Sequence, residues 1–294
     1  MRYYTEDYLR TEDGAEIWHA VLGEGEPALV MCDGLGCAGF AWKHLIRHLV
    51  PQHRILRFNY RGHGRSGLAT EPERTGIGFF ADDLARLLEA TKIRQAVILG
   101  HSMGVQVAFE FHRRHPERCL ALVPICGSYG NPLDTVHDNP GMKALFPFLV
   151  AAVEKAPRLS RGLTKAIMPS ELAYQFARFT EINRHLVRRE DFEPYFTHLA
   201  QMDVGVFLRT LESAANHTAW DHLGKVDVPT LIVAADHDRF TPMWLSERMH
   251  HAVPDSEMLV VRSGTHTAII EMPELIALRI ERFLKERLAP RQAA

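Results

Sequence analysis

Apolar residues along the chain follow two different spacings. Short apolar runs bounded by turn residues are typical of β-strands, and they occupy residues 15–21, 27–32, 53–60, 95–100 and 119–126 and begin again at 228 and 257. Helix-like segments separate them, at 80–88, 105–115 and 273–288, where apolar residues recur every three or four positions. Strands that alternate with helices predict crossover connections and a mainly parallel sheet, which is the α/β class.

The alternation stops near Asn131. Between residues 131 and 222 the strand-like runs disappear, and the pattern becomes helical with many prolines and aromatic residues. We interpret this stretch as a helical insertion into one large α/β domain. The predicted organisation is an amino-terminal part of the core (1–130), a helical cap or lid (131–222) and a carboxyl-terminal part of the core (223–294).

Charge and composition narrow the range of partners. Lys and Arg number 34 against 36 Asp and Glu, so the net charge of -2 provides no overall positive field for nucleic acid or an acidic bilayer. The amino terminus lacks a basic region followed by an apolar one, and no apolar run approaches the roughly 20 residues that span a membrane. We expect a cytoplasmic protein without a membrane span. The four cysteines form no Cys-x-x-Cys pair, and we expect them to be reduced and structural.

The most informative motif is GHSMG at residues 100–104, which fits G-x-S-x-G between a buried strand and a helix. A serine in this setting lies on a tight, strained turn, and glycines at both ends avoid collisions with neighbouring backbone. The turn exposes the hydroxyl of Ser102 as a candidate nucleophile. It also directs the backbone N–H of Met103 towards the place where negative charge would develop.

A serine hydroxyl needs a base that removes its proton. His266 follows the strand that begins at residue 257, and a loop at the carboxyl end of that strand would bring its imidazole near Ser102. Other histidines lack this placement. We interpret the following as surface or packing residues: His63, His101, His237, His250 and His251.

The base needs an anionic partner that fixes its tautomer and stabilises the imidazolium. Asp236 and Asp238 both follow the strand that begins at residue 228. Aspartates in such loops are often turn formers, so the residues alone leave the choice open. The chain order Ser, Asp, His is the one expected for a G-x-S-x-G turn.

These motifs together resemble those of α/β-hydrolase-fold proteins, over almost the full length of the chain apart from the insertion. AADHDRFTP is similar to the family pattern G-x-x-D-x-x-x-P, which implies Asp238 rather than Asp236 as the acid, and SGTHTAIIEMPE resembles the ending around the family's histidine, here His266. The resemblance implies a mostly parallel, eight-stranded sheet flanked by helices and carrying a helical cap. It also implies an oxyanion hole made by the backbone N–H groups of Leu35 and Met103.

Two positions depart from the family pattern. NYRGHGRS resembles the turn D-x-R-G-x-G-x-S, but Asn59 replaces the usual aspartate, and we expect this to concern loop structure rather than chemistry. Asp33 stands where most relatives have a histidine, next to the expected oxyanion hole. A carboxylate there would oppose a developing negative charge unless it is turned away or hydrogen-bonded. We therefore expect the side chain of Asp33 to cap the glycine-rich loop.

The predicted cap is rich in large apolar residues. The segment MKALFPFLVAAVEKA, residues 142–156, could simply pack on the core, or it could line a pocket above the serine. An apolar lining favours an acyl or alkyl substrate over a sugar or a phosphate. The candidate substrate-binding residues are Leu145, Phe148, Phe179 and Phe207.

The expected function is a serine hydrolase that cleaves carboxylic esters with an apolar acyl or alkyl portion through an acyl-enzyme. Haloalkane dehalogenases and epoxide hydrolases of this fold use an aspartate nucleophile where Ser102 stands, which disfavours both. Lactone hydrolysis, acyl transfer and carbon–carbon bond hydrolysis stay open, although Thr267 replaces the tryptophan that is common in the last group. A ligand receptor that keeps the fold without turnover is a further alternative.

No cofactor or metal is implied. GLGCAG lacks the G-x-G-x-x-G spacing and the lysine of a phosphate-binding loop, and ADHD lacks further ligands for a metal. The expected partner is a small-molecule apolar ester or lactone. The sequence leaves the oligomeric state open.

Overall fold

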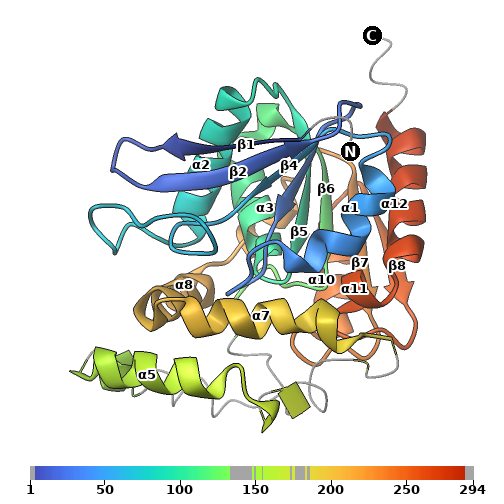
Figure 1. The fold of residues 1–294 in the computed structure, drawn as a ribbon. Coiled ribbons are helices and arrows are strands. Elements are labelled where there is room, and N and C mark those ends of the chain that lie inside the picture. Colours follow the sequence, from blue (N-terminus) through green and yellow to red (C-terminus); the bar gives the residue numbers. More distant parts are fainter. Residues whose placement is uncertain are drawn as a thin grey trace.

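The computed structural model describes residues 4–132, 148, 150–153, 155–172, 174–175, 183 and 186–288. These residues contain an eight-stranded sheet with the order β1-β2-β4-β3-β5-β6-β7-β8 (Figure 1). Strand β2 pairs antiparallel with β1 and β4, and the remaining pairs are parallel. The strands are β1 (Tyr4–Arg10), β2 (Glu16–Leu22), β3 (Leu29–Cys32), β4 (Ile55–Phe58), β5 (Ala96–His101), β6 (Cys119–Ile125), β7 (Thr230–Ala235) and β8 (Ser256–Val261). The predicted α/β class and mostly parallel sheet are confirmed.

The strand that the apolar pattern does not reveal is β1. Its residues are exposed along most of its length, with Tyr4 and Tyr8 at 50% and 47% exposure. An edge strand that buries neither face has no alternation of apolar and polar residues, so periodicity cannot locate it. Strands β2 to β8 coincide with the predicted runs to within a few residues.

Helices cover both faces of the sheet. The short elements are η1 (Phe40–Trp42), η2 (Pro116–Arg118), α9 (Trp220–Leu223) and α11 (Ala268–Glu271). The longer helices are α1 (Lys43–Leu49), α2 (Ile77–Ala90), α3 (Gly104–Arg114), α5 (Pro157–Ile167), α7 (Arg189–Gln201), α8 (Val204–Asn216), α10 (Met243–Ala252) and α12 (Pro273–Leu288).

Successive residues of the strands point into two different cores. In β3, Leu29 and Met31 join the core that includes residues of α1 and α12, whereas Val30 and Cys32 join the core that includes residues of α2, α3 and α10. A parallel strand buried on both faces is apolar throughout, which is why β3, β5 and β6 appear as continuous apolar runs in the sequence.

Helices α7 and α8 lie beyond the carboxyl ends of β3 and β4, and α5 lies outside them (Figure 1). Phe192 of α7 packs edge-on against Phe40 of η1, with ring centroids 5.8 Å apart. Val206 of α8 lies against Gly62 in the turn after β4, where an added Cβ would come within 2.7 Å of its Cγ1. These helices belong to the stretch predicted as a cap. Its boundaries stay predictions, and the carboxyl-terminal one falls inside α9.

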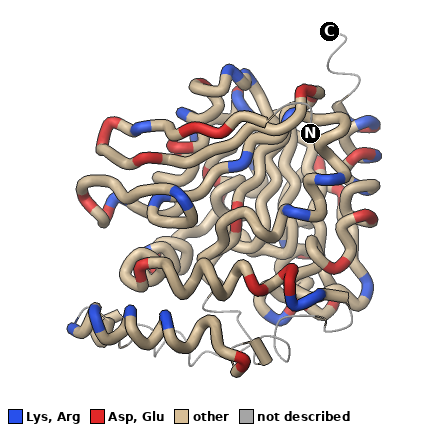
Figure 2. The backbone as a smooth tube through the Cα atoms, viewed as in Figure 1, with Lys and Arg blue, Asp and Glu red and all other residues tan. Residues whose placement is uncertain are grey.

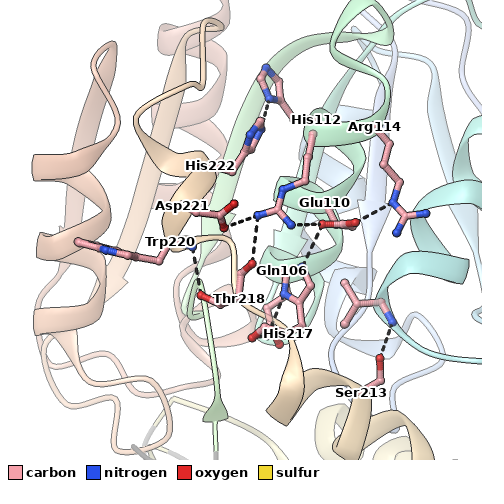
Figure 3. Close-up of polar contacts among 12 residues, drawn as sticks. Gln106, Glu110, His112, Arg114, Ser213, His217, Thr218, Trp220, Asp221 and His222 are labelled. Carbon is pink, nitrogen blue, oxygen red and sulfur yellow. Dashed lines mark hydrogen bonds and ion pairs between the residues drawn. The ribbon is translucent and has the colours of Figure 1, made fainter.

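The segment that returns the chain from α8 to the core is anchored on α3 (Figure 3). Gln106 Nε2 donates to the carbonyl of Ala214 at 2.8 Å, and His217 Nε2 donates to Glu110 at 3.1 Å. Glu110 also accepts hydrogen bonds from Arg113 and Arg114 at 2.8 and 2.7 Å. Burial opposes ionisation of Glu110, but its bonds to His217 and Arg114 and the two arginine charges outweigh this and lower its pKa to about 2.

Charges of both signs are interspersed over the backbone in the view of Figure 2. Among the helices that the structure describes, none has both the length and the apolar character needed to cross a bilayer. The four cysteines are unpaired and buried.

Replacing Glu110 with Gln should lower the free energy of unfolding at pH 7 by about 2 kcal/mol, because two arginines and His217 lose a charged acceptor. The folded-state pKa of Glu110, about 2, lies below its ordinary value of 4.5, so ionisation stabilises the fold above pH 4.5 and this contribution is lost as the pH falls towards 2. The difference in free energy of unfolding between wild type and variant should therefore be largest at pH 7 and should decrease below about pH 4.5. Urea unfolding at several pH values measures it.

The matched control is Glu117→Gln, at an exposed glutamate beyond the end of the same helix. It should change the free energy of unfolding by less than about 0.5 kcal/mol. An equal loss in both variants would contradict the anchoring role of Glu110.

Candidate active site

Ser102 occupies a strained turn between β5 and α3. Its φ of 57° lies in the left-handed region, which is costly for a residue other than glycine. An added Cβ at Gly100 would lie 2.3 Å from the carbonyl oxygen of Gly104, and one at Gly104 would lie 2.1 Å from that of Cys32. Both contacts are with backbone, so no larger residue fits without moving α3 away from the sheet.

Three side chains from separate loops meet at this turn. The imidazole of His266, in the loop after β8, places Nε2 at 2.9 Å from Ser102 Oγ. On its other side, Nδ1 lies 3.0 Å from Oδ2 of Asp238, which follows β7. The structure thus brings Ser102, His266 and Asp238 into one hydrogen-bonded chain. Asp236 instead lies 3.7 Å from Arg262.

Asp238 is buried and surrounded by donors. Its Oδ1 accepts from the N–H groups of Phe240 and Thr241, both at 2.9 Å, and its Oδ2 accepts from the Thr241 hydroxyl at 2.7 Å. Burial opposes ionisation, but the charge of His266 and the hydrogen bonds from His266 and Thr241 together hold the pKa of Asp238 below its ordinary value. The carboxylate is therefore ionised at neutral pH.

A second buried carboxylate holds the loop that carries His266. Glu271 accepts from the N–H of Thr265 at 2.8 Å and from the hydroxyl of Thr267 at 2.9 Å, on either side of the histidine. It also accepts from the N–H of Asn183 at 3.1 Å. Glu271 therefore links the histidine loop to the stretch predicted as a cap.

His101 supports the same loop from the other side. Its Nε2 donates to the carbonyl of His266 at 3.0 Å, and burial lowers the pKa of His101 to about 4. The ring is neutral at pH 7, in keeping with the packing role expected for it. Within the described chain, His266 is the histidine whose ring bonds to Ser102.

The glycine-rich loop after β3 lies against the serine. An added Cβ at Gly34 would come within 3.1 Å of Ser102 Cβ, so the following residue, Leu35, is adjacent to the nucleophile position. Among the described residues, the N–H groups of Leu35 and Met103 donate to no protein acceptor. The oxyanion hole formed by these two N–H groups stays a prediction.

The side chain of Asp33 is buried and hydrogen-bonded. Its Oδ1 accepts from Trp42 Nε1 at 2.8 Å, and the backbone of Gly39 also hydrogen-bonds to it. Burial raises the pKa of the Asp33 carboxyl to about 7, against the lowering effect of Arg57 and these two donors. The other departure, Asn59, accepts from the N–H of Arg65 at 3.1 Å and shapes the turn after β4.

Two apolar side chains, one from α7 and one from α8, lie against the glycine-rich loop. An added Cβ at Gly36 would lie 2.6 Å from Leu199 Cδ2 and 3.2 Å from Phe207 Cε2. Phe207 is one of the predicted lining residues and lies here, whereas Leu199 is not among them. Phe148 is 73% exposed. Leu145 and Phe179 lie outside the described residues.

Sequence reasoning misses the side chains that support the reacting groups. Thr241 and Glu271 carry several of the hydrogen bonds at the site, and Thr241 has no signal of its own in the sequence. Glu271 is visible there only as a member of the family's ending. No group of three or more His, Cys, Asp or Glu in the described part of the chain is arranged to hold a metal ion.

The sheet order, the strained serine turn and the two loops that meet it define an α/β protein with a serine-centred site at the carboxyl ends of its parallel strands. The family model described as alpha/beta hydrolase fold matches residues 27–273, most of the chain. The chain therefore belongs to the alpha/beta hydrolase fold family.

Known proteins with similar sequences and structures cover nearly the whole chain. A putative carbamate hydrolase, RutD, of Azorhizobium caulinodans is 25% identical, with 89% of this chain and 92% of that protein aligned. A hydrolase from Pseudomonas aeruginosa superposes with a TM-score of 0.78 at 22% identity, covering 95% and 98% of the two chains. A thermophilic esterase from Thermogutta terrifontis gives 0.75 at 22% identity, covering 96% and 98%.

Replacing Gly104 with Ala should destabilise the protein by roughly 2–4 kcal/mol, because the new methyl group meets the carbonyl oxygens of Cys32 and Asp33 at 2.1 and 2.8 Å. Chemical unfolding measures the loss.

Gly162→Ala is the matched control. Gly162 lies inside α5 with nothing within 4 Å of the added Cβ. There the same change should be neutral or stabilise by up to about 1 kcal/mol through helix propensity. Similar effects at both positions would show that α3 tolerates displacement from β3.

Proposed function

We propose that the protein is a serine hydrolase that cleaves carboxylic esters with an apolar acyl or alkyl portion. The observation that carries the proposal is the continuous chain from Ser102 Oγ through His266 to Asp238, with distances of 2.9 and 3.0 Å. Such a chain lets the hydroxyl lose its proton as it attacks, and it fixes the tautomer that accepts that proton.

In the first half of the reaction, Ser102 Oγ attacks the ester carbonyl and His266 Nε2 takes the hydroxyl proton. The carbonyl oxygen becomes an anion held by the N–H groups of Leu35 and Met103. Collapse of this intermediate breaks the bond to the alcohol, which leaves with the proton from His266. In the second half, water attacks the acyl-serine with His266 again as the base, releasing the acid and restoring Ser102.

The proposed preference for substrates with an apolar portion rests on two side chains of α7 and α8. Leu199 and Phe207 lie over Gly36, one residue from the proposed oxyanion donor Leu35. A group bound next to that donor would meet hydrocarbon and an aromatic edge rather than charge. Carbamates are a second candidate class, favoured by the similarity to the putative carbamate hydrolase, because acyl transfer to serine is the same chemistry.

The proposal is tested with a fluorophosphonate probe and a set of p-nitrophenyl esters of increasing acyl length. The probe should label wild type and leave Ser102→Ala unlabelled, and turnover should rise from acetyl towards medium chains. Labelling that persists in Ser102→Ala would remove the serine from its role. A labelled serine with no turnover of any ester would favour carbamates or lactones, which the same assay format can measure.

Replacing Asp238 with Asn should lower kcat by about 10³–10⁴-fold, because the amide no longer fixes the productive tautomer of His266. Asp236→Asn, two residues away and paired with Arg262, should change kcat by less than threefold, which is within about 1 kcal/mol of activation free energy. Steady-state kinetics on the best ester measures both. A larger loss in Asp236→Asn than in Asp238→Asn would reassign the acid.

A further inference from the structure

We infer that Thr241 is a positioning residue of this site, whose hydroxyl joins Asp238 to His266 and sets how strongly the carboxylate holds the imidazole proton. The inference rests on the proposed function and adds a fourth side chain to it. The hydrogen bonds of Thr241 at the site go to Asp238 and His266, so it acts through these two neighbours.

The direction of the Thr241 hydroxyl is determined by what surrounds it. Oγ1 lies 2.7 Å from Asp238 Oδ2 and 3.4 Å from His266 Nδ1. An ionised carboxylate only accepts, so the single hydroxyl hydrogen points to Asp238. The lone pairs of Oγ1 then face the Nδ1–H of His266, which lies between two acceptors, Oδ2 at 3.0 Å and Oγ1 at 3.4 Å.

This arrangement leaves Asp238 with four hydrogen bonds. Oδ1 receives two backbone N–H groups, and Oδ2 receives the Thr241 hydroxyl and the imidazole. Each donor spreads the negative charge, and the hydroxyl shares the same oxygen as His266. The carboxylate therefore attracts the imidazolium less strongly than it would without Thr241.

The same short segment also contacts the imidazole by its ring. Phe240 lies with its centroid 5.0 Å from that of His266. The loop between β7 and α10 thus contacts the imidazole in three ways: by the Asp238 carboxylate, the Phe240 ring and the Thr241 hydroxyl. Removing the Thr241 hydroxyl takes one hydrogen bond from the Asp238 carboxylate. The backbone N–H groups of Phe240 and Thr241 still hold the loop in its conformation.

Other titratable groups near His266 and its loop come from three further places. The Cys126 thiol, just after β6, lies beside the carbonyl of Thr265, and burial raises its pKa. His101, at the end of β5, has its ring centroid 5.2 Å from that of His266 and is neutral at pH 7. Glu271 binds Thr265 and Thr267 beside the histidine. Among the described residues, Asp238 is the carboxylate that bonds to the imidazole itself, so a change at Thr241 acts through Asp238.

The test compares Thr241→Val with Thr241→Ser. Valine has the same shape without the hydroxyl, and serine keeps the hydroxyl without the methyl group. For each protein, the second-order rate of fluorophosphonate labelling and kcat/KM for the best ester are measured from pH 5 to 9.

In Thr241→Val, a carboxylate with one hydrogen bond fewer should hold the protonated imidazole more strongly. The midpoint of the acid limb should move to higher pH by roughly half a unit, and the plateau should fall about tenfold as the imidazole loses its second acceptor. Thr241→Ser should restore both the midpoint and most of the plateau. A merely structural role would lower the plateau without moving the midpoint, and serine would not rescue it.

Thr230→Val supplies the matched control. Thr230 is fully buried at the start of β7, and its hydroxyl donates to the carbonyl of Val228 at 3.2 Å, far from the reacting groups. The midpoint of its acid limb should match that of wild type. Thr241→Ala replaces Thr241→Val in the comparison if the valine variant does not show a cooperative thermal transition.

The outcomes separate this inference from the proposed function. If wild type is labelled and the acid limb is unmoved in Thr241→Val, or serine fails to restore it, Thr241 has no positioning role while the triad stands. If wild type is not labelled at any pH, the proposed function falls and this inference falls with it.

Discussion

The close approach of α3 to the sheet is the constraint on which the site depends. The first turn of this helix lies so near β3 and β5 that a methyl group at Gly100 or Gly104 would overlap backbone atoms. Between the two glycines the chain reverses within a few residues, and Ser102 is left with a positive φ. The strain is offset by the two packed cores on either side of the sheet, which hold strand and helix in place. Without this strained turn, the hydroxyl of Ser102 would not stand clear of the sheet.

The carboxylates near the site are stabilised differently from those elsewhere. Two buried carboxylates away from the site, Glu110 of α3 and Asp83 of α2, bind arginines. Asp238 and Glu271 are surrounded instead by backbone N–H groups and threonine hydroxyls. At Asp238, neutral donors add to the effect of His266 in lowering the pKa of the carboxyl, without placing a permanent positive charge beside it. Since an arginine next to Asp238 would compete with the imidazolium for the same anion, the choice of donors matches a histidine that must gain and lose a proton.

The sequence predicts what depends on local pattern. Buried parallel strands are continuously apolar, and a serine between glycines at a strand–helix junction is typical of an exposed nucleophile, so most of the sheet and Ser102 can be located from the residues alone. Strand β1 cannot, because it is exposed on both faces. The choice of Asp238 over Asp236 needs a family pattern, since both aspartates follow the same strand. The positions of Thr241 and Leu199 at the site result from tertiary contacts. No sequence pattern around a single threonine or leucine predicts such contacts.

The stretch predicted as a cap is linked to the core at three separated places, and the links differ in kind. Leu199 and Phe207 cover the glycine-rich loop by apolar contact, the Asn183 N–H binds Glu271 beneath the histidine loop, and the segment after α8 is fixed on α3 through Glu110. The last link is a charged, multiply bonded anchor, whereas the first is apolar packing and the second is one hydrogen bond from a backbone N–H. The charged anchor therefore lies where this stretch rejoins the core, whereas the contacts with the glycine-rich loop and the histidine loop consist of apolar packing and one hydrogen bond. Because Glu271 accepts from Asn183 as well as from Thr265 and Thr267, one carboxylate holds both the stretch predicted as a cap and the loop that carries His266.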